Sequence, residues 1–223
     1  MSEPAYVSTR GGDRADFRAA ALRGLAPDGG LYVPEIWPAA PGAEGRPYRD
    51  VLIETAARFV GAALSSQALA AACDRALAGF DHPEIAPLRQ VGPNLHLLEL
   101  FHGPTAAFKD FAMQLMAPLL TGVLGDGPDL LLLTATSGDT GAAAVHAFAD
   151  LLRVKLVVFH PLDRVSPVQR LQMTTTRAAN VLNLAVRGDF DDCQGLLKAL
   201  LADAGLRRDR RVSSVNSVNF ARL

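Results

Sequence analysis

The chain has 223 residues, of which 49% are hydrophobic and 20% charged, and its formal net charge is -1. This composition is that of an ordinary globular protein, far from a disordered or membrane-embedded chain. A charge so close to zero gives no electrostatic reason to expect nucleic acid or an anionic membrane as a partner. Any anion that the chain binds must therefore be held by a few placed groups.

The sequence also argues against several special classes of protein. The N-terminus has neither the basic nor the apolar segment of a secretory signal. The longest apolar runs, such as residues 130–133, are far shorter than the roughly 20 residues that a membrane span needs. Cys73 and Cys193 are too few and too far apart for a disulfide scaffold, and the five histidines show no metal-ligand spacing. We expect a cytoplasmic protein without a metal.

Residues 1–92 are predicted to form a helix-rich N-terminal domain with irregular connections. Apolar residues recur at helical spacing in residues 16–25 and 50–63. Residues 66–80 are rich in alanine and leucine, and Ser65 or Ser66 can cap their first turn. Residues 27–34 are predicted to form a turn followed by a short extended segment.

Residues 93–223 alternate between strand and helix. Strands are predicted at 95–100, 129–134, 154–159, 181–186 and 211–215, and helices at 108–124, 140–152, 166–176 and 190–204. Such alternation with continuous apolar strands predicts an α/β fold, with a parallel sheet covered by helices on both faces. The chain ends just where another helix should begin, so we expect 93–223 to be the first part of a truncated domain.

Ligands of parallel α/β sheets bind beyond the carboxyl ends of the strands, and three loops at such positions are unusually polar. The first, residues 99–108, turns at Gly103 and Pro104 and brings Lys109 into the first turn of an apolar helix. The positive end of a helix dipole lowers the pKa of an amine, which suits a Schiff-base nucleophile. Taken alone, however, a lysine in a helix is usually just solvated.

The second loop, residues 134–144, joins a buried strand to a helix of small residues. Gly138 and Gly141 let the backbone approach a ligand, Ser137 and Thr140 supply hydroxyls, and the N–H groups that open the helix suit a carboxylate or phosphate. The alternative is a helix cap with tight packing. The third loop, residues 213–222, places Asn216 and Ser217 after a strand and Arg222 further on, as in a phosphate clamp. Such Asn/Ser loops are also common turns.

Several motifs give the chain a family resemblance. Residues 102–110 (HGPTAAFKD) and 135–144 (ATSGDTGAAA) resemble the cofactor-lysine segment and the substrate loop of the threonine synthases. Further similar segments follow in family order: residues 6–11, 24–34, 164–174, 188–194 and 215–219. The resemblance spans nearly the whole chain as the N-terminal half of such an enzyme. Ala106 departs from it, because a larger apolar residue is expected there.

The resemblance implies a pyridoxal 5'-phosphate (PLP) enzyme of the second structural class, which includes the tryptophan synthase β subunit. Threonine synthases convert O-phospho-L-homoserine and water to L-threonine and phosphate. Lys109 would hold PLP as a Schiff base and move protons, and Asp139 would lie near the 3'-oxygen of the cofactor. Ser137, Gly138 and Thr140, with Thr136 nearby, would hold the substrate carboxylate. The leaving phosphate would be held by Asn216, Ser217 and Arg222.

The loop that holds the PLP phosphate in this family lies in later sequence, so we expect the isolated chain to bind PLP weakly and to be inactive or nearly so. Two alternatives stay open. One is a related phospholyase that omits water addition and releases a 2-oxo acid and ammonia. The other is a non-catalytic anion-binding fragment. The sequence does not indicate an oligomeric state.

Overall fold

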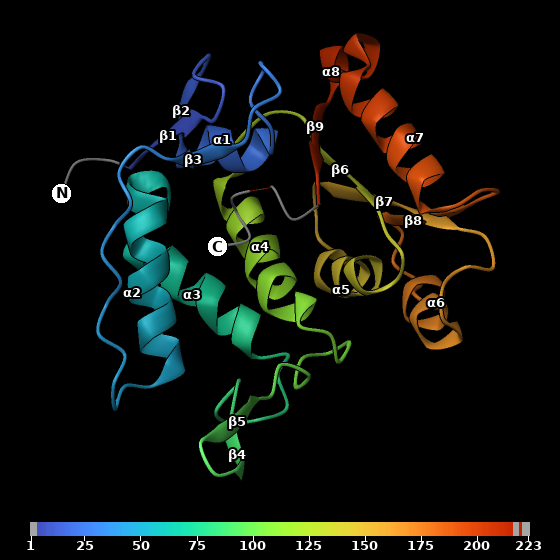
Figure 1. The fold of residues 1–223 in the computed structure, drawn as a ribbon. Helices are drawn as coiled ribbons and strands as arrows, with labels where there is room; N and C mark the ends of the chain where they lie inside the picture. The colour runs from blue at the N-terminus through green and yellow to red at the C-terminus, as the bar shows by residue number, and fades with distance from the viewer. Residues whose placement is uncertain (1–3, 216–218, 220–223) are drawn as a thin grey trace.

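The computed structural model describes residues 4–215 and residue 219, apart from the side chain of Asp209. Figure 1 shows the N-terminal strands and helices on one side and a parallel sheet with its helices on the other, with α4 between them. No helix in this described part is both long enough and apolar enough to cross a membrane.

A small antiparallel sheet opens the chain. Its strands are β1 (Ala5–Ser8), β2 (Arg14–Asp16) and β3 (Tyr32–Pro34), in the order β2-β1-β3. The extended segment at β3 was expected, whereas β1 and β2 were not, because strands of four and three residues are too short to show a clear alternation.

The expected N-terminal helices are present as α1 (Phe17–Arg23), α2 (Tyr48–Val60), a 3₁₀ turn η1 (Gly61–Ala63) and α3 (Ser66–Leu77). Asp16 caps α1 by accepting a hydrogen bond from the Ala19 N–H at 2.7 Å. Ser65 caps α3 in the same way through the Ala68 N–H at 3.2 Å, as its position in the sequence predicted.

The predicted α/β architecture is confirmed in the second part of the chain. Four strands pair in parallel in the order β8-β7-β6-β9. They are β6 (Leu130–Ala135), β7 (Val154–Pro161), β8 (Val181–Val186) and β9 (Arg211–Ser214). The helices are α4 (Lys109–Val123), α5 (Asp139–Phe148), α6 (Pro167–Thr174), α7 (Phe190–Ala202) and α8 (Ala204–Asp209).

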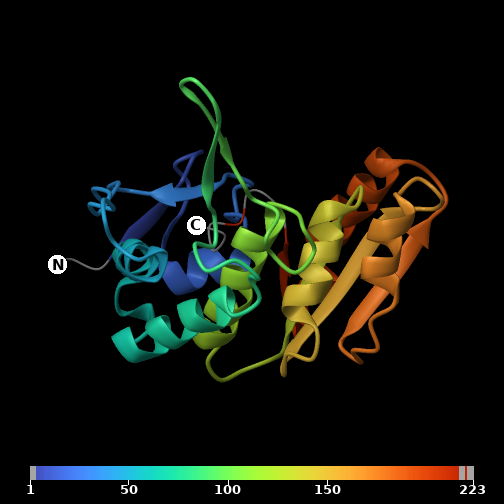
Figure 2. The ribbon, with the colours of Figure 1, turned by 90° about the horizontal axis from the view of Figure 1, so that it is seen from below.

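Alternate side chains of β6 explain why helices cover both faces of the sheet. Leu130 and Leu132 belong to the large core that also contains side chains of α4 and α5. Leu131 and Leu133 point the other way, into a smaller cluster with Leu197 of α7. Figure 2 shows the helices distributed on the two sides of the sheet accordingly.

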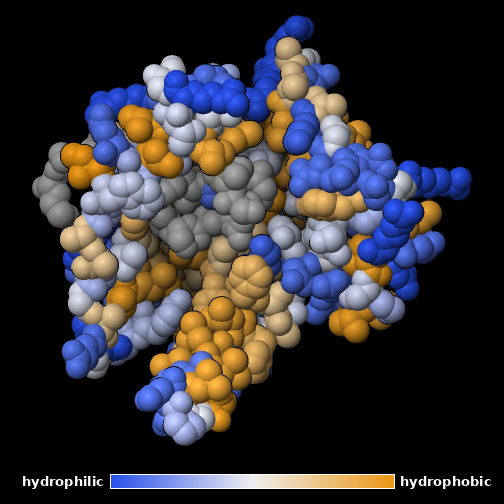
Figure 3. Space-filling model, viewed as in Figure 1, coloured by the Kyte–Doolittle hydropathy of each residue, from blue (hydrophilic) through white to orange (hydrophobic). Residues whose placement is uncertain are grey.

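The strand predicted at 95–100 lies elsewhere than expected. It forms β5 (Leu95–Leu98), which pairs antiparallel with β4 (Leu88–Gly92) in a hairpin outside the parallel sheet. All four residues of β5 are exposed, and the hairpin projects from the molecule with apolar side chains on its surface (Figures 2 and 3). The assignment to the parallel sheet was wrong because a short apolar run does not reveal whether it is buried.

The helix predicted at 190–204 ends at Ala202, and a second helix, α8, follows it. Asp203 ends α7 and caps α8, since its carboxylate accepts a hydrogen bond from the Leu206 N–H at 2.6 Å. The predicted domain boundary after residue 92 falls in the β4–β5 hairpin. Buried side chains from both sides of it, such as Tyr6 and Leu132, belong to one core cluster, and the division into two domains stays a prediction.

Candidate active site

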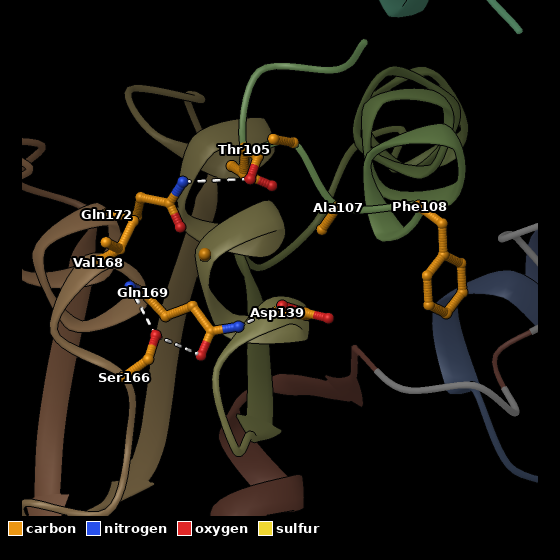
Figure 4. Close-up of a pocket in the computed structure, with 10 residues that line it drawn as sticks. Thr105, Ala107, Phe108, Asp139, Ser166, Val168, Gln169 and Gln172 are labelled. Atoms are coloured by element: carbon orange, nitrogen blue, oxygen red, sulfur yellow. Dashed lines mark hydrogen bonds between the residues drawn. The ribbon is translucent and has the colours of Figure 1, made fainter. Parts of the chain in front are cut away.

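A cavity of about 430 Å³ lies where three segments meet: the loop before α4, the start of α5, and α6. Figure 4 shows its walls, with side chains of α6 reaching toward the two loops. The lining residues are Thr105, Ala106, Ala107, Phe108, Asp139, Ala142, Ser166, Val168, Gln169 and Gln172. The first and second polar loops therefore meet at one cavity, although the first loop follows the hairpin strand β5 and not, as expected, a strand of the parallel sheet.

Lys109 is the first residue of α4 and directly follows the four loop residues that line the cavity. Its side chain is half-buried, and its Nζ lies 4.4 Å from the centroid of the Phe108 ring. The sequence therefore placed this amine correctly in the first turn of an apolar helix, next to the cavity wall.

The loop before Lys109 is fixed by Asp110, a residue for which no role was predicted from the sequence. Asp110 is fully buried, and its carboxylate accepts hydrogen bonds from the N–H of Thr105 at 2.9 Å and its Oγ1 at 2.8 Å. A Cβ on Gly103 would come within 2.5 Å of the Asp110 Cβ, so the turn requires glycine there. Ala106 adopts a φ of 56° at the cavity wall, a conformation that disfavours large side chains.

Thr136 organises the second loop from within. It is buried, and its Oγ1 accepts hydrogen bonds from the N–H groups of Gly138 and Gly141, both at 2.9 Å. This hydroxyl is thus part of the loop's internal structure. Ser137 is exposed and Thr140 half-buried. Of the residues predicted from this loop, Asp139 lines the cavity.

Two glutamines of α6 connect these loops, and neither was predicted from the sequence to belong to the site. Gln169 Nε2 donates a short hydrogen bond to Asp139 Oδ1, while its Oε1 accepts one from Ser166 Oγ at 2.9 Å. Gln172 Nε2 donates to the Thr105 carbonyl at 3.2 Å. Figure 4 shows the contacts of both glutamines. Their i, i+3 spacing places them on one helix face, which is the signal in the sequence that could have revealed them.

The third predicted loop is described in part. Asn216, Ser217 and Arg222 lie outside the described residues. The segment that leads to them is held against β6, because Thr134 Oγ1 donates to the Val215 carbonyl at 2.8 Å. Asn219 is buried, and its Nδ2 donates to the Ala21 carbonyl at 3.1 Å.

His102, in the cofactor-lysine motif, lies between two carboxylates. Its Nε2 is 2.7 Å from Glu99 Oε2, and its Nδ1 is 3.2 Å from Asp81 Oδ1. Hydrogen bonding to Glu99, and less strongly to Asp81, raises the pKa of His102 above its usual value of 6.5. A charged network thus fixes the point where the exposed hairpin joins the loop before α4.

Comparison with known proteins agrees with this arrangement. The profile of a family described as "Threonine synthase N terminus" matches residues 5–77. The threonine synthase of Pseudomonas aeruginosa is 44% identical over 225 residues, which cover 98% of this chain and 48% of that protein. The threonine synthase of Schizosaccharomyces pombe is 38% identical, over all of this chain and 46% of its own length. The chain matches the N-terminal half of the threonine synthases.

Solved threonine synthase structures share the fold. A crystal structure of PLP-bound threonine synthase from Brucella melitensis superposes with a TM-score of 0.90 at 40% identity, covering 98% of this chain and 49% of that one. The yeast threonine synthase superposes with a TM-score of 0.87 at 33% identity. The fold is therefore that of the matched half of these enzymes, in the second structural class of PLP proteins. The chain spans about half the length of the relatives it matches.

Proposed function

We propose that this chain supplies the Schiff-base lysine and the substrate loops of a threonine synthase, which converts O-phospho-L-homoserine and water to L-threonine and phosphate. The observation that carries the proposal is the cavity at which the Lys109 loop and the Thr136–Thr140 loop meet. The similarity to threonine synthases over 98% of the chain supports it.

The residues present fit PLP by their chemistry. A primary amine is the group that condenses with the aldehyde of PLP, and Lys109 brings one to the end of the cavity-lining loop. When bound, PLP supplies an electron sink for reactions at the substrate's Cα and Cβ. We assign to Lys109 the attachment of the cofactor and the movement of protons at those two carbons. Asp139, held by Gln169, would contact the cofactor near its 3'-oxygen.

The second and third loops would hold the substrate at its two charged ends. Ser137, Gly138 and Thr140 would bind the carboxylate. Thr136 stabilises the conformation of their loop through its two hydrogen bonds. At the other end, the leaving phosphate would be held by Asn216, Ser217 and Arg222. Fixing both ends aligns the Cγ–O bond for elimination, which is a proximity effect.

The test is a chimera in which residues 1–223 replace the matched half of the P. aeruginosa threonine synthase. We expect it to release threonine and phosphate from O-phospho-L-homoserine. Lys109→Ala should abolish the reaction, and Lys155→Ala, an exposed lysine on β7, should not. A folded chimera that forms no product would refute the proposal, and release of a 2-oxo acid and ammonia would identify a phospholyase.

We further propose that residues 1–223 alone turn over the substrate poorly or not at all, because they span only about half the length of the active relatives. The same product assay on the isolated chain tests this. Threonine formation at the rate of the chimera would contradict it.

A further inference from the structure

A second cavity, of about 400 Å³, lies between α1 and the start of β9 and is walled largely by arginines. The arginines are Arg18, Arg23, Arg207, Arg210 and Arg211. They come from α1, α8, β9 and the residue between α8 and β9, and Figure 1 shows β9 between α1 and α8. None of them lines the cavity described above.

The two cavities lie at opposite edges of the parallel sheet. Arg211 is the first residue of β9 and pairs in register with Leu130, the first residue of β6. The arginine cavity is thus at the amino ends of these strands. The candidate active site follows the carboxyl end of β6. An anion held by the arginines would not contact the Lys109 loop.

The positive charges of this cavity are poorly compensated. Among the described residues, Arg23 is paired with Asp13 at 3.0 Å, whereas no ion pair involves the guanidinium of Arg18, Arg207, Arg210 or Arg211. The one acidic residue in the wall, Asp16, already accepts the capping hydrogen bond from Ala19. Like charges gathered in this way repel one another, and a bound anion would relieve that repulsion.

Two of the guanidiniums are held in place before any ligand arrives. Arg211 donates to the carbonyls of Leu124 and Asp126, the latter at 2.9 Å. Arg207 Nε donates to the Leu201 carbonyl at 2.6 Å. Arg18 packs against the same loop that holds Arg211, since a Cβ on Gly125 would lie 2.9 Å from Arg18 Nη2. Preorganised donors reduce the ordering cost of binding.

The chemistry of the wall indicates the class of ligand. Planar guanidiniums bind phosphate and carboxylate oxygens in pairs. Ala19, Leu22 and Val212 give the cavity an apolar part, and its volume is within the range of roughly 300–1,000 Å³ of small-molecule sites. We propose that this cavity binds a small organic phosphate that carries more than one negative charge. This site is separate from the proposed catalytic one.

The experiment is titration calorimetry of residues 1–223 at low ionic strength, with pyrophosphate and ADP as probes. Pyrophosphate should bind, and the apolar part of the cavity should make ADP bind more tightly. Arg18→Gln and Arg210→Gln should each weaken binding at least about tenfold, as expected for the loss of a charge-assisted hydrogen bond. Both side chains are exposed, so the variants should keep their fold, which circular dichroism checks.

The matched control is Arg208→Gln, an exposed arginine of α8 that does not line the cavity. It should leave the affinity unchanged, as should Lys109→Ala at the candidate active site. Absence of binding at millimolar pyrophosphate would overturn the proposal, and so would binding that Arg18→Gln and Arg210→Gln leave intact. If ADP binds no more tightly than pyrophosphate, the organic part of the ligand assignment is wrong.

Discussion

Two hydrogen bonds join Thr105 to Asp110 and close the segment between them, which contains Lys109. The N–H and the Oγ1 of Thr105 both donate to the buried Asp110 carboxylate, at 2.9 and 2.8 Å. Asp110 is the second residue of α4. The same interaction therefore fixes the cavity-lining loop and ties it to the helix that carries Lys109.

Replacing this carboxylate should destabilise the protein. Asp110→Asn substitutes an NH₂ group for one of the two acceptor oxygens, so one buried donor of Thr105 loses its partner. We expect the free energy of unfolding to fall by about 1–3 kcal/mol, measured by urea denaturation. Asp126→Asn, at an exposed carboxylate, is the control and should change it by less than about 0.5 kcal/mol. Equal effects of the two changes would contradict this role of Asp110.

Gly138 should tolerate no side chain. It has a φ of 148°, and an added Cβ would come within 2.1 Å of Gln169 Oε1. Gly138→Ala should therefore lower the free energy of unfolding by about 1–3 kcal/mol. Gly195→Ala, in the exposed face of α7 with open space around it, should instead raise it by up to about 1 kcal/mol. Thermal denaturation of the two variants should show stability changes of opposite sign. An unchanged stability of Gly138→Ala would show that the loop adopts another conformation.

Gln172 should restrain the loop before Lys109. Gln172→Leu removes its hydrogen bond to the Thr105 carbonyl and should lower the free energy of unfolding by about 0.5–1.5 kcal/mol. Hydrogen exchange of amides 105–110 should become faster, because the loop loses its contact with α6. Gln67→Leu, on an exposed position of α3, should leave that exchange unchanged. Unaltered protection in Gln172→Leu would mean that α6 does not restrain the loop.

His102 should contribute to stability in a pH-dependent way. Glu99 raises the pKa of His102 above 6.5 because its carboxylate stabilises the imidazolium. The contribution is therefore fully present below about pH 6.5 and disappears as the pH rises through the pKa of the folded state. Glu99→Gln should lower the pKa of His102, as read from its ring proton shifts by NMR. Glu44→Gln, at an exposed glutamate, should not change this pKa. An unchanged pKa of His102 in Glu99→Gln would contradict the assignment.

The sequence predicted those parts of the fold whose signals are local. The strands β6 to β9 were located within two residues at each end, because each is a short segment with apolar or β-branched residues between turn residues. Acidic residues that open a helix favour capping, and Asp192 accepts a hydrogen bond from the Asp189 N–H at 2.8 Å. The partner of β5 could not be predicted, since pairing with β4 depends on tertiary arrangement and not on the apolar run itself.

In the candidate site, too, only the features with a local signal could be predicted from the sequence. Motif positions placed Lys109 and Asp139 correctly at the ends of secondary-structure elements. The roles of Asp110, Gln169 and Gln172 were missed, because each depends on a contact with a segment that the sequence does not place in space. The hydroxyl of Thr136 contacts its own loop, and its expected position near a ligand carboxylate stays a prediction.

We propose that Lys109 is the residue that holds PLP. The lysines of the chain are Lys109, Lys155 and Lys198, so borohydride reduction in the presence of PLP, followed by peptide mass spectrometry of the chimera, tests it directly. We expect a pyridoxyl label on Lys109 in wild type and in Lys155→Arg and Lys198→Arg, and none in Lys109→Ala. A label that persists in Lys109→Ala, or that appears mainly on Lys155 or Lys198, would contradict it.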